Sequence, residues 1–291
     1  MDETGIAKAI GWPGPVVADS RAAARERARF LNEFGAAIVR RHPDRFGLFA
    51  SIPPLGDVDG ALAEIDYAMD VLHADGIGMV THYGESWLGD AAFMPVFQEL
   101  DRRHAVVYVH PQGANGECGC GMQGYQTPPM SAAWLEYPFN TARCILNLMG
   151  TGTLRRFPKI RFIFCHGGGA FTPLIGRLNG FSGWFDMGND KLAEIFPEGI
   201  DAEFQRLYFE CAQAYSPESM ALLLSRIPSS QLLFGSDYDR FSLRHSVEEL
   251  GRLDLSTDIR AALEYGNAQR LFETRWATMA TESRRDAVRQ A

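Results

Sequence analysis

The feature that most constrains this chain is the regular alternation of short β-branched and aromatic runs with longer segments of helical periodicity. Such alternation is typical of parallel α/β folds, in which a helix returns the chain from each strand to the next. The pattern predicts seven strands, at Ile6–Ile10, Phe46–Ile52, Gly76–Thr81, Ala105–His110, Arg161–His166, Leu207–Cys211 and Gln231–Ser236. We therefore expect a TIM-barrel type of α/β fold, although a closed (β/α)₈ barrel needs eight strands.

Residues with helix-start preferences stand at the beginnings of the predicted helices. Asp57 and Asp90 each precede a segment in which apolar residues recur three and four apart. An aspartate at that position accepts hydrogen bonds from the first free N–H groups of a helix. Pro217 begins another helical segment, where its missing N–H is tolerated. A further helix is predicted over Ser256–Phe272.

Composition indicates an ordinary globular protein without an internal boundary. The 291 residues are 46% hydrophobic and 22% charged, and no Pro- or Gly-rich linker divides them. We therefore expect residues 1–291 to form one barrel domain. Within it, the irregular segment 111–137 is expected to act as a lid, and residues 274–291 are expected to form a C-terminal tail or docking helix.

Charge, hydropathy and cysteine usage exclude several classes of partner. The net charge of −8 would repel a nucleic-acid backbone, and no basic stripe offsets it. No apolar run approaches the roughly 18 residues of a membrane span, and the first residues lack the pattern of a secretory signal. The five cysteines stand at irregular spacings, which favours reduced thiols and a cytoplasmic location.

Three of the predicted strands end in a side chain suited to metal or proton chemistry. His110 ends the run Val-Val-Tyr-Val-His, His166 ends Phe-Ile-Phe-Cys-His, and Asp237 follows Leu-Leu-Phe-Gly-Ser. In a parallel barrel, catalytic groups project from the carboxyl ends of the strands. Imidazole and carboxylate groups that met at one mouth would suit a divalent metal, or a metal-bound water with an acid–base partner.

Period-two alternation predicts which side chains share a face of each strand. Tyr108 is expected on the same face as His110, and Phe164 on the same face as His166. If the two histidines point inward, Cys165 faces the helices and belongs to the core.

Each of these residues also has a structural interpretation. A histidine at a strand end is often a hydrogen-bonded structural residue, and Gly-Ser-Asp after a strand is often an Asx-turn or helix cap. Three such endings on separate strands favour an active site. The glycines at 167–169 add to that case, because glycine lets a ligand approach the backbone or lets the backbone form an anion nest. Spacing alone leaves both interpretations open.

Two other polar residues lie at strand ends. His82 could contact a substrate or make a loop hydrogen bond, and Glu210 could support a ligand or be a satisfied buried carboxylate.

Several motifs resemble the amidohydrolase-2 branch of the amidohydrolase superfamily. They occur in the family's order and cover nearly the whole chain: Tyr83-Gly84 with Leu88-Gly89-Asp90, Val109-His110-Pro111, Glu136-Tyr137-Pro138-Phe139, Phe164-Cys165-His166-Gly167-Gly168-Gly169-Ala170-Phe171, Gly235-Ser236-Asp237-Tyr238 and Gly266-Asn267-Ala268. The chain is most similar to the family's non-oxidative decarboxylases, which act on aminocarboxymuconate semialdehyde, 6-methylsalicylate or γ-resorcylate.

The resemblance implies a (β/α)₈ barrel with one divalent metal, zinc or manganese, a small carboxylic acid as substrate and a homodimeric state. By position, His110 resembles the metal ligand that ends strand five, and Asp237 resembles the metal-binding aspartate that ends strand eight. His166 resembles the strand-six histidine that acts as an acid–base or orients metal-bound water. The expected catalytic residues are thus His166 and Asp237, and the expected metal-binding residues are His110, Asp237 and His166.

This sequence departs from the family pattern at its beginning. The family's first strand carries two further metal ligands as His-x-His or Glu-x-His, and no such motif occurs here. The expectation is that the first strand is missing, either because the chain is truncated or because it is a degenerate homologue. Its absence would expose the edges of the strands at Ile6–Ile10 and Gln231–Ser236.

The substrate is expected to be aromatic. The semialdehyde decarboxylase holds a carboxylate with an arginine after its glycine motif, whereas here only Arg177 of the general family motif follows, and then Trp184 and Phe185. We expect these two aromatic residues and His82 to contact substrate, in a decarboxylase of a hydroxylated aromatic or related unsaturated acid. Two alternatives remain: a metal-dependent hydrolase of a lactone, amide or ester, and a catalytically impaired barrel that only binds.

Overall fold

The computed structural model describes residues 1–112, 131–180, 193–273 and 276. Seven strands form one parallel sheet in the order β1-β2-β3-β6-β7-β8-β9. Their bounds are β1 Ala9–Gly11, β2 Phe46–Ser51, β3 Gly76–Val80, β6 Val106–His110, β7 Arg161–Phe164, β8 Tyr208–Glu210 and β9 Leu232–Leu233. A short hairpin, β4 His82–Tyr83 with β5 Ser86–Trp87, follows β3. The predicted parallel α/β fold is confirmed.

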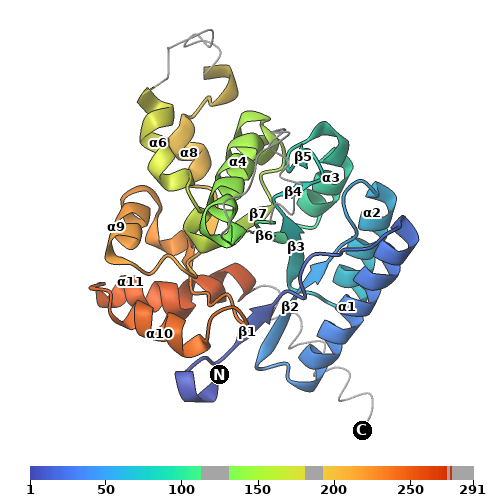
Figure 1. The fold of residues 1–291 in the computed structure, drawn as a ribbon, viewed down its shortest axis with the longest axis horizontal. Helices are drawn as coiled ribbons and strands as arrows, with labels where there is room; N and C mark the ends of the chain where they lie inside the picture. The colour runs from blue at the N-terminus through green and yellow to red at the C-terminus, as the bar shows by residue number, and fades with distance from the viewer. Residues whose placement is uncertain (113–130, 181–192, 274–275, 277–291) are drawn as a thin grey trace.

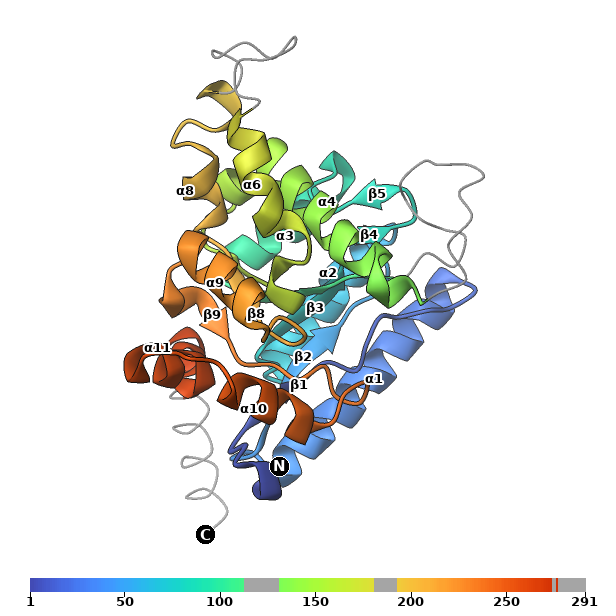
Figure 2. The same cartoon turned by 60° about the vertical axis from the view of Figure 1, so that its left-hand side comes forward.

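Helices surround the strands in both views of the molecule (Figures 1 and 2). The longer ones are α1 Arg21–Arg41, α2 Val58–Asp66, α3 Met94–Arg102, α4 Glu136–Gly150, α6 Phe171–Gly180, α9 Pro217–Arg226 and α10 Leu243–Gly251. The short ones are α5 Thr153–Arg156, α8 Ile200–Phe204, α11 Thr257–Ala261, π-turns η2 Tyr67–Val71 and η7 Ala262–Gly266, and 3₁₀ turns η1 Asp2–Thr4, η3 Ala91–Phe93, η4 Ala132–Trp134, η5 His166–Gly168 and η6 Ser229–Gln231.

The predicted helix starts are confirmed in their hydrogen bonds. The Asp57 carboxylate accepts from Gly60 N at the start of α2, and the Asp90 carboxylate accepts from Ala92 N before α3. Pro217 is the first residue of α9, and Ser256 caps the helix that begins at Thr257. Each cap satisfies a backbone N–H that has no partner within its helix.

The sheet curls, because side chains from its two edges share one interior cluster. Ile10 of β1 and Leu233 of β9 belong to this cluster together with inward-facing residues of the strands between them, Phe49, Val106, Tyr108, Ile163 and Tyr208. The alternate residues of the strands pack against the helices in a second, larger core. A sheet with both faces covered in this way buries its strands almost completely.

The end of the chain covers one side of the interior cluster. Leu271 and Phe272 join it, and the Phe272 ring lies 6.0 Å from that of Phe49. Trp276 Nε1 donates a hydrogen bond of 2.9 Å to the buried carboxylate of Asp75. Aromatic side chains from the C-terminal segment therefore fill space that strand residues alone leave open.

The predicted edge strands are shorter than expected. The first strand is Ala9–Gly11 rather than Ile6–Ile10, and the last is only Leu232–Leu233. The last strand stops because the next N–H groups bond elsewhere: Phe234 N donates to Leu263 O, and Gly235 N donates to the Tyr215 hydroxyl. The described elements include no strand between β1 and β9, and the absence of the family's first strand stays a prediction.

Candidate active site

His110 stands at the carboxyl end of β6 with one ring nitrogen committed to the backbone. Its Nδ1 lies 2.7 Å from the carbonyl oxygen of Pro111, which accepts the Nδ1 proton and leaves Nε2 with a free lone pair. Aromatic rings surround the imidazole, with centroids at 6.0 Å for both Trp12 and Tyr137. These contacts hold the ring in one orientation.

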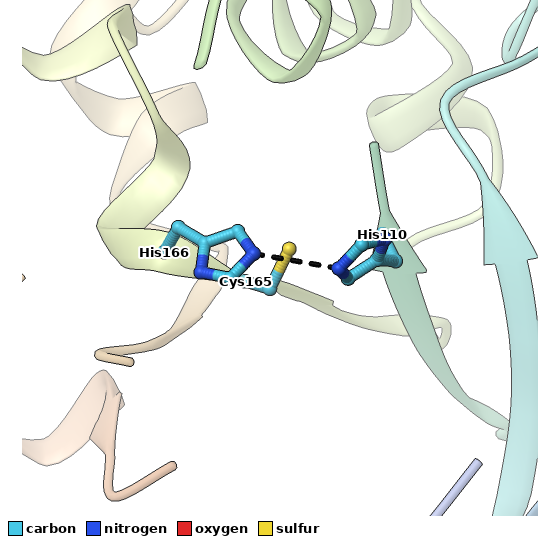
Figure 3. A group of neighbouring side chains, drawn as sticks. All are labelled: His110, Cys165 and His166. Carbon is cyan, nitrogen blue, oxygen red and sulfur yellow. Dashed lines mark hydrogen bonds between the residues drawn. The ribbon is translucent and has the colours of Figure 1, made fainter. Parts of the chain in front are cut away.

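His166 follows β7 and adopts a left-handed backbone conformation, with φ of 56°. Its Nδ1 lies 3.2 Å from the carbonyl oxygen of Ala212, so the same tautomer is set here. Its backbone N–H donates to the Glu210 carboxylate at 3.4 Å. The side chain consequently turns toward His110, and the two Nε2 atoms lie 3.4 Å apart (Figure 3).

The two Nε2 atoms lie at hydrogen-bond distance, a spacing that suits a shared proton or a cation bound beside them. With both Nδ1 atoms donating to carbonyls, each Nε2 of a neutral ring presents a lone pair to the other. A shared proton would require a charged imidazole, but burial and, to a lesser extent, the neighbouring His166 lower the pKa of His110 to about 4. A metal ion satisfies two facing lone pairs without that cost, and carbonyl-bound Nδ1–H groups are the usual support of metal-binding histidines.

Cys165 lies on the site side of its strand, which corrects the prediction that it faces the helices. Its sulfur forms a cluster with the imidazoles of His110 and His166 in which all three ligand atoms lie within 4.8 Å of one another (Figure 3). Phe164, expected beside His166, packs instead in the helix-facing core. The physical reason is that β7 ends at Phe164, and the left-handed turn at His166 brings two consecutive side chains to the same side.

Asp237 also has a left-handed backbone, with φ of 52°, in the turn after β9. Its half-buried carboxyl is not part of the three-residue cluster. Burial raises its pKa, while electrostatic interactions with His166 and Arg240 oppose that shift. Asp237 is therefore close enough to His166 for an electrostatic interaction and holds its proton more strongly than an exposed aspartate.

Glu210, at the end of β8, braces the backbone around His166. Its carboxylate accepts from His166 N and, at 2.6 Å, from Ala212 N, the residue whose carbonyl holds the His166 ring. Gly235 makes room for it, because a Cβ there would lie 1.5 Å from Glu210 Oε1. Burial raises the pKa of this carboxyl, and the nearby His166 opposes the rise.

The glycines after His166 allow close packing of the turn, and the anion nest considered from sequence stays a prediction. A Cβ at Gly168 would lie 2.6 Å from the Phe209 ring, and a Cβ at Gly169 would lie 2.4 Å from the Pro138 carbonyl oxygen. Both have positive φ, which glycine adopts without strain. The run lets the turn that carries His166 sit tightly against β8 and α4.

A cavity of about 390 Å³ opens at the carboxyl ends of β1, β2 and β3. Its lining includes Trp12, Val16, Val80 and Tyr83. Gln112, two residues beyond His110, also lines it, and the Trp12 ring lies 6.0 Å from that of His110. No lysine or arginine occurs among the described lining residues. The cavity is thus mostly apolar, and Trp12 lies between it and His110.

Trp12 is a site residue that sequence reasoning missed. Its indole lies over Gly78 of β3, where a Cβ would be 2.2 Å from Trp12 Nε1. That N–H has no hydrogen-bond partner in the described part of the chain, although it is buried. The signal in the sequence was a tryptophan just after the first strand, paired with a glycine in a neighbouring strand.

Of the three residues expected to contact substrate, His82 lies in the described part of the chain. His82 is 1% exposed, its Nδ1 lies 3.0 Å from Gly84 O, and its ring packs on Trp87 of the hairpin. It is not among the described residues that line the cavity, so its position fits the loop hydrogen bond that the sequence left open. Trp184 and Phe185 lie outside the described residues, as do most of the expected lid 111–137 and nearly all of the expected tail 274–291.

The whole sequence except its two ends matches one family. The match runs over residues 7–274 and is to the amidohydrolase family. The chain belongs to this family. The site at the ends of β6, β7 and β9 therefore occupies the edge at which barrel enzymes carry their catalytic groups.

Curated relatives of the chain include fungal decarboxylases. A 6-methylsalicylic acid decarboxylase from Aspergillus aculeatus is 34% identical over 270 residues, which is 89% of this chain and 79% of the relative. A decarboxylase from Aspergillus niger is 33% identical over 229 residues, or 77% of this chain, and the match spans only 61% of that relative's length.

Solved structures share the fold. A dihydroxybenzoic acid decarboxylase from Polaromonas sp. JS666, which contains manganese and the inhibitor 2-nitroresorcinol, superposes with a TM-score of 0.73 at 22% identity, over 94% of this chain and 83% of that one. At this identity the likeness concerns the fold alone.

Among the described residues, no helix combines the length and apolarity that crossing a membrane requires.

Proposed function

We propose that the protein is a metal-dependent, non-oxidative decarboxylase of a hydroxylated aromatic carboxylic acid. The observation that carries this proposal is the pair of Nε2 lone pairs, 3.4 Å apart, beside an apolar cavity lined by aromatic rings. The fungal relatives that act on 6-methylsalicylic acid support the same substrate class.

The donor set fits a divalent metal. Two imidazole nitrogens are suitable ligands for zinc, and the solved structure with bound manganese supports a divalent ion in this fold. We assign the ion to His110 and His166. Bound there, it would act as a Lewis acid on a substrate oxygen and offset the negative charge of the carboxylate.

Two residues were each predicted to have two roles, and we choose between them. His166 was predicted as ligand or acid–base, and its nitrogen facing His110 favours the ligand. Asp237 was predicted as ligand or catalytic residue, and its place outside the three-residue cluster, with a pKa raised by burial, favours the proton donor.

The proton balance follows from these roles. Protonated Asp237 gives its proton to the ring carbon that bears the carboxylate. The bond between that carbon and the carboxylate carbon then breaks, its electron pair restores the aromatic ring, and carbon dioxide leaves. Asp237 recovers a proton from solvent, to which its half-buried carboxyl has access.

The cavity favours an aromatic acid over a flexible diacid. Trp12 offers an indole face and an unpartnered N–H next to His110, and the described lining holds no basic side chain for a second carboxylate. We propose that Trp12 stacks on the substrate ring and that Trp184 and Phe185 add contacts to it.

Two further expectations accompany this proposal. They are a homodimeric state and a cytoplasmic location. The last is supported by Cys144, Cys165 and Cys211, which are all free thiols.

The test is incubation of the purified chain with 6-methylsalicylate and 2,6-dihydroxybenzoate, with zinc or manganese added. We expect carbon dioxide and the matching phenol from at least one acid. The control is Asp237→Asn, which should lower turnover with unchanged metal content. Absence of product from both acids in metal-loaded protein would overturn the substrate class.

A further inference from the structure

We propose that Cys165 is a metal ligand, so that this chain holds its ion in a site of two imidazole nitrogens and one thiolate sulfur. The proposal rests on the metal dependence proposed above. It adds a sulfur ligand that the similarity to other amidohydrolases does not assign. It also predicts which metal the site prefers.

The first argument is distance. Two nitrogens bound to a tetrahedral zinc at about 2.05 Å are about 3.3 Å apart, and a sulfur at about 2.3 Å lies about 3.6 Å from each nitrogen. The observed separation of the two Nε2 atoms is 3.4 Å, and Cys165 Sγ lies within 4.8 Å of both. The nitrogens already have the spacing of a zinc site, and each sulfur–nitrogen distance must shorten by about 1.2 Å at most.

The second argument is backbone geometry. Consecutive residues of a strand point to opposite faces, so Cys165 and His166 could not both reach His110 if β7 continued. The left-handed turn at His166 removes that restriction. Glu210 holds this turn through the His166 and Ala212 N–H groups, and the glycines at 168 and 169 allow its close packing. The turn thus places the side chains of two adjacent residues, Cys165 and His166, beside His110.

The third argument concerns the surroundings of the sulfur. Cys165 is fully buried and hydrogen-bonded to the Tyr108 hydroxyl. Burial raises the pKa of its thiol, so the thiol keeps its proton until an ion displaces it. Tyr108 is itself held by a stacked contact with Phe49, at 5.4 Å between ring centroids. A hydroxyl fixed beside a ligand atom is the usual outer support of a metal site. Buried Cys144 in α4 belongs to the helix-facing core, and the described residues contain no such cluster around it.

Ligand chemistry then predicts the preferred ion. Thiolate and imidazole together suit zinc, whereas manganese prefers carboxylate and other oxygen ligands. Binding replaces the thiol proton with the metal–sulfur bond, and that proton leaves to solvent with no change in oxidation state. We therefore expect zinc to bind with release of one proton more in the wild type than in Cys165→Ser.

Cobalt(II) provides the direct test, because a cysteine ligand produces a thiolate-to-cobalt charge-transfer band in the near ultraviolet. We expect this band in the wild-type chain loaded with cobalt, its loss in Cys165→Ser, and its retention in the matched control Cys144→Ser. Absence of the band in cobalt-loaded wild type overturns the proposal without any variant.

Metal competition adds a second measurement. The ratio of zinc to manganese affinity should fall at least about tenfold in Cys165→Ser and remain unchanged in Cys144→Ser. An equal loss of both affinities in Cys165→Ser would contradict a thiolate ligand. Wild-type turnover of 6-methylsalicylate without the cobalt band would overturn the cysteine ligand alone. The band without turnover of any tested acid would overturn the decarboxylase alone.

Discussion

The ends of β6 and β7 hold their histidines with both rings tied to backbone carbonyls, whereas the end of β9 leaves Asp237 half-buried in a turn. The first region is built on strands of five and four residues with continuous parallel pairing. The second follows a two-residue strand whose next N–H groups bond to the Leu263 carbonyl and to the Tyr215 hydroxyl. The difference suits the two tasks, because ligands need a fixed geometry and an acid needs access to solvent.

The largest effect is expected from removing a ligand in the rigid region. His110→Asn should weaken zinc binding by more than about 100-fold and abolish turnover, because one of the two facing lone pairs is lost. Metal content after dialysis and turnover of 6-methylsalicylate are the measurements. Stoichiometric metal in the variant would show that His110 does not hold the ion.

Removing the carboxylic acid of Asp237 should distinguish its role from that of the two histidines. Asp237→Asn keeps the shape of the side chain but cannot donate the proton, so kcat should fall by about 10²–10⁴-fold. Metal content should stay at the wild-type level. If metal and activity disappear together, Asp237 is a ligand and the division of roles drawn here is wrong.

The support of the rigid region can be tested through its glycines. Gly169→Ala places a Cβ against the Pro138 carbonyl in a backbone with φ of 60°. We expect a loss of about 1–3 kcal/mol in the free energy of unfolding together with weaker metal binding, because the turn that carries His166 must move. Gly176→Ala is the matched control, since no atom lies within 4 Å of its Cβ position. Denaturant unfolding of both variants measures the difference.

A carboxylate far from the site should show the opposite titration behaviour to Asp237. Asp57 accepts two hydrogen bonds of 2.6 Å from Arg25, which hold its pKa below the usual 3.8. Its contribution to stability is therefore complete above pH 4 or so and is lost as the pH falls through the lowered folded-state pKa. Asp57→Ala should cost about 1 kcal/mol near neutral pH through the lost helix cap, and less in acid. A cost that did not shrink in acid would contradict this.

Much of the architecture follows from local patterns. All seven strands lie where β-branched and aromatic runs predict them, and Asp57, Asp90, Pro217 and Ser256 mark helix starts through hydrogen bonds or φ values that depend on near neighbours alone. The pairing of His110 with His166 at one edge was also predictable, because parallel strands bring their carboxyl ends together.

The sequence by itself determined the order of strands and helices and which strand ends carry ligands, since these depend on periodicity and on the direction of the strands. Only the tertiary structure decided that the side chain of His166 lies on the same side of β7 as that of Cys165. The left-handed turn at His166 breaks the alternation of β7, and it is held by Glu210 from β8 and by close packing against Phe209 and Pro138. Those contacts join residues far apart in the chain, and no local pattern contains them. The strand-end histidines were readable from sequence, but the sulfur beside them was not.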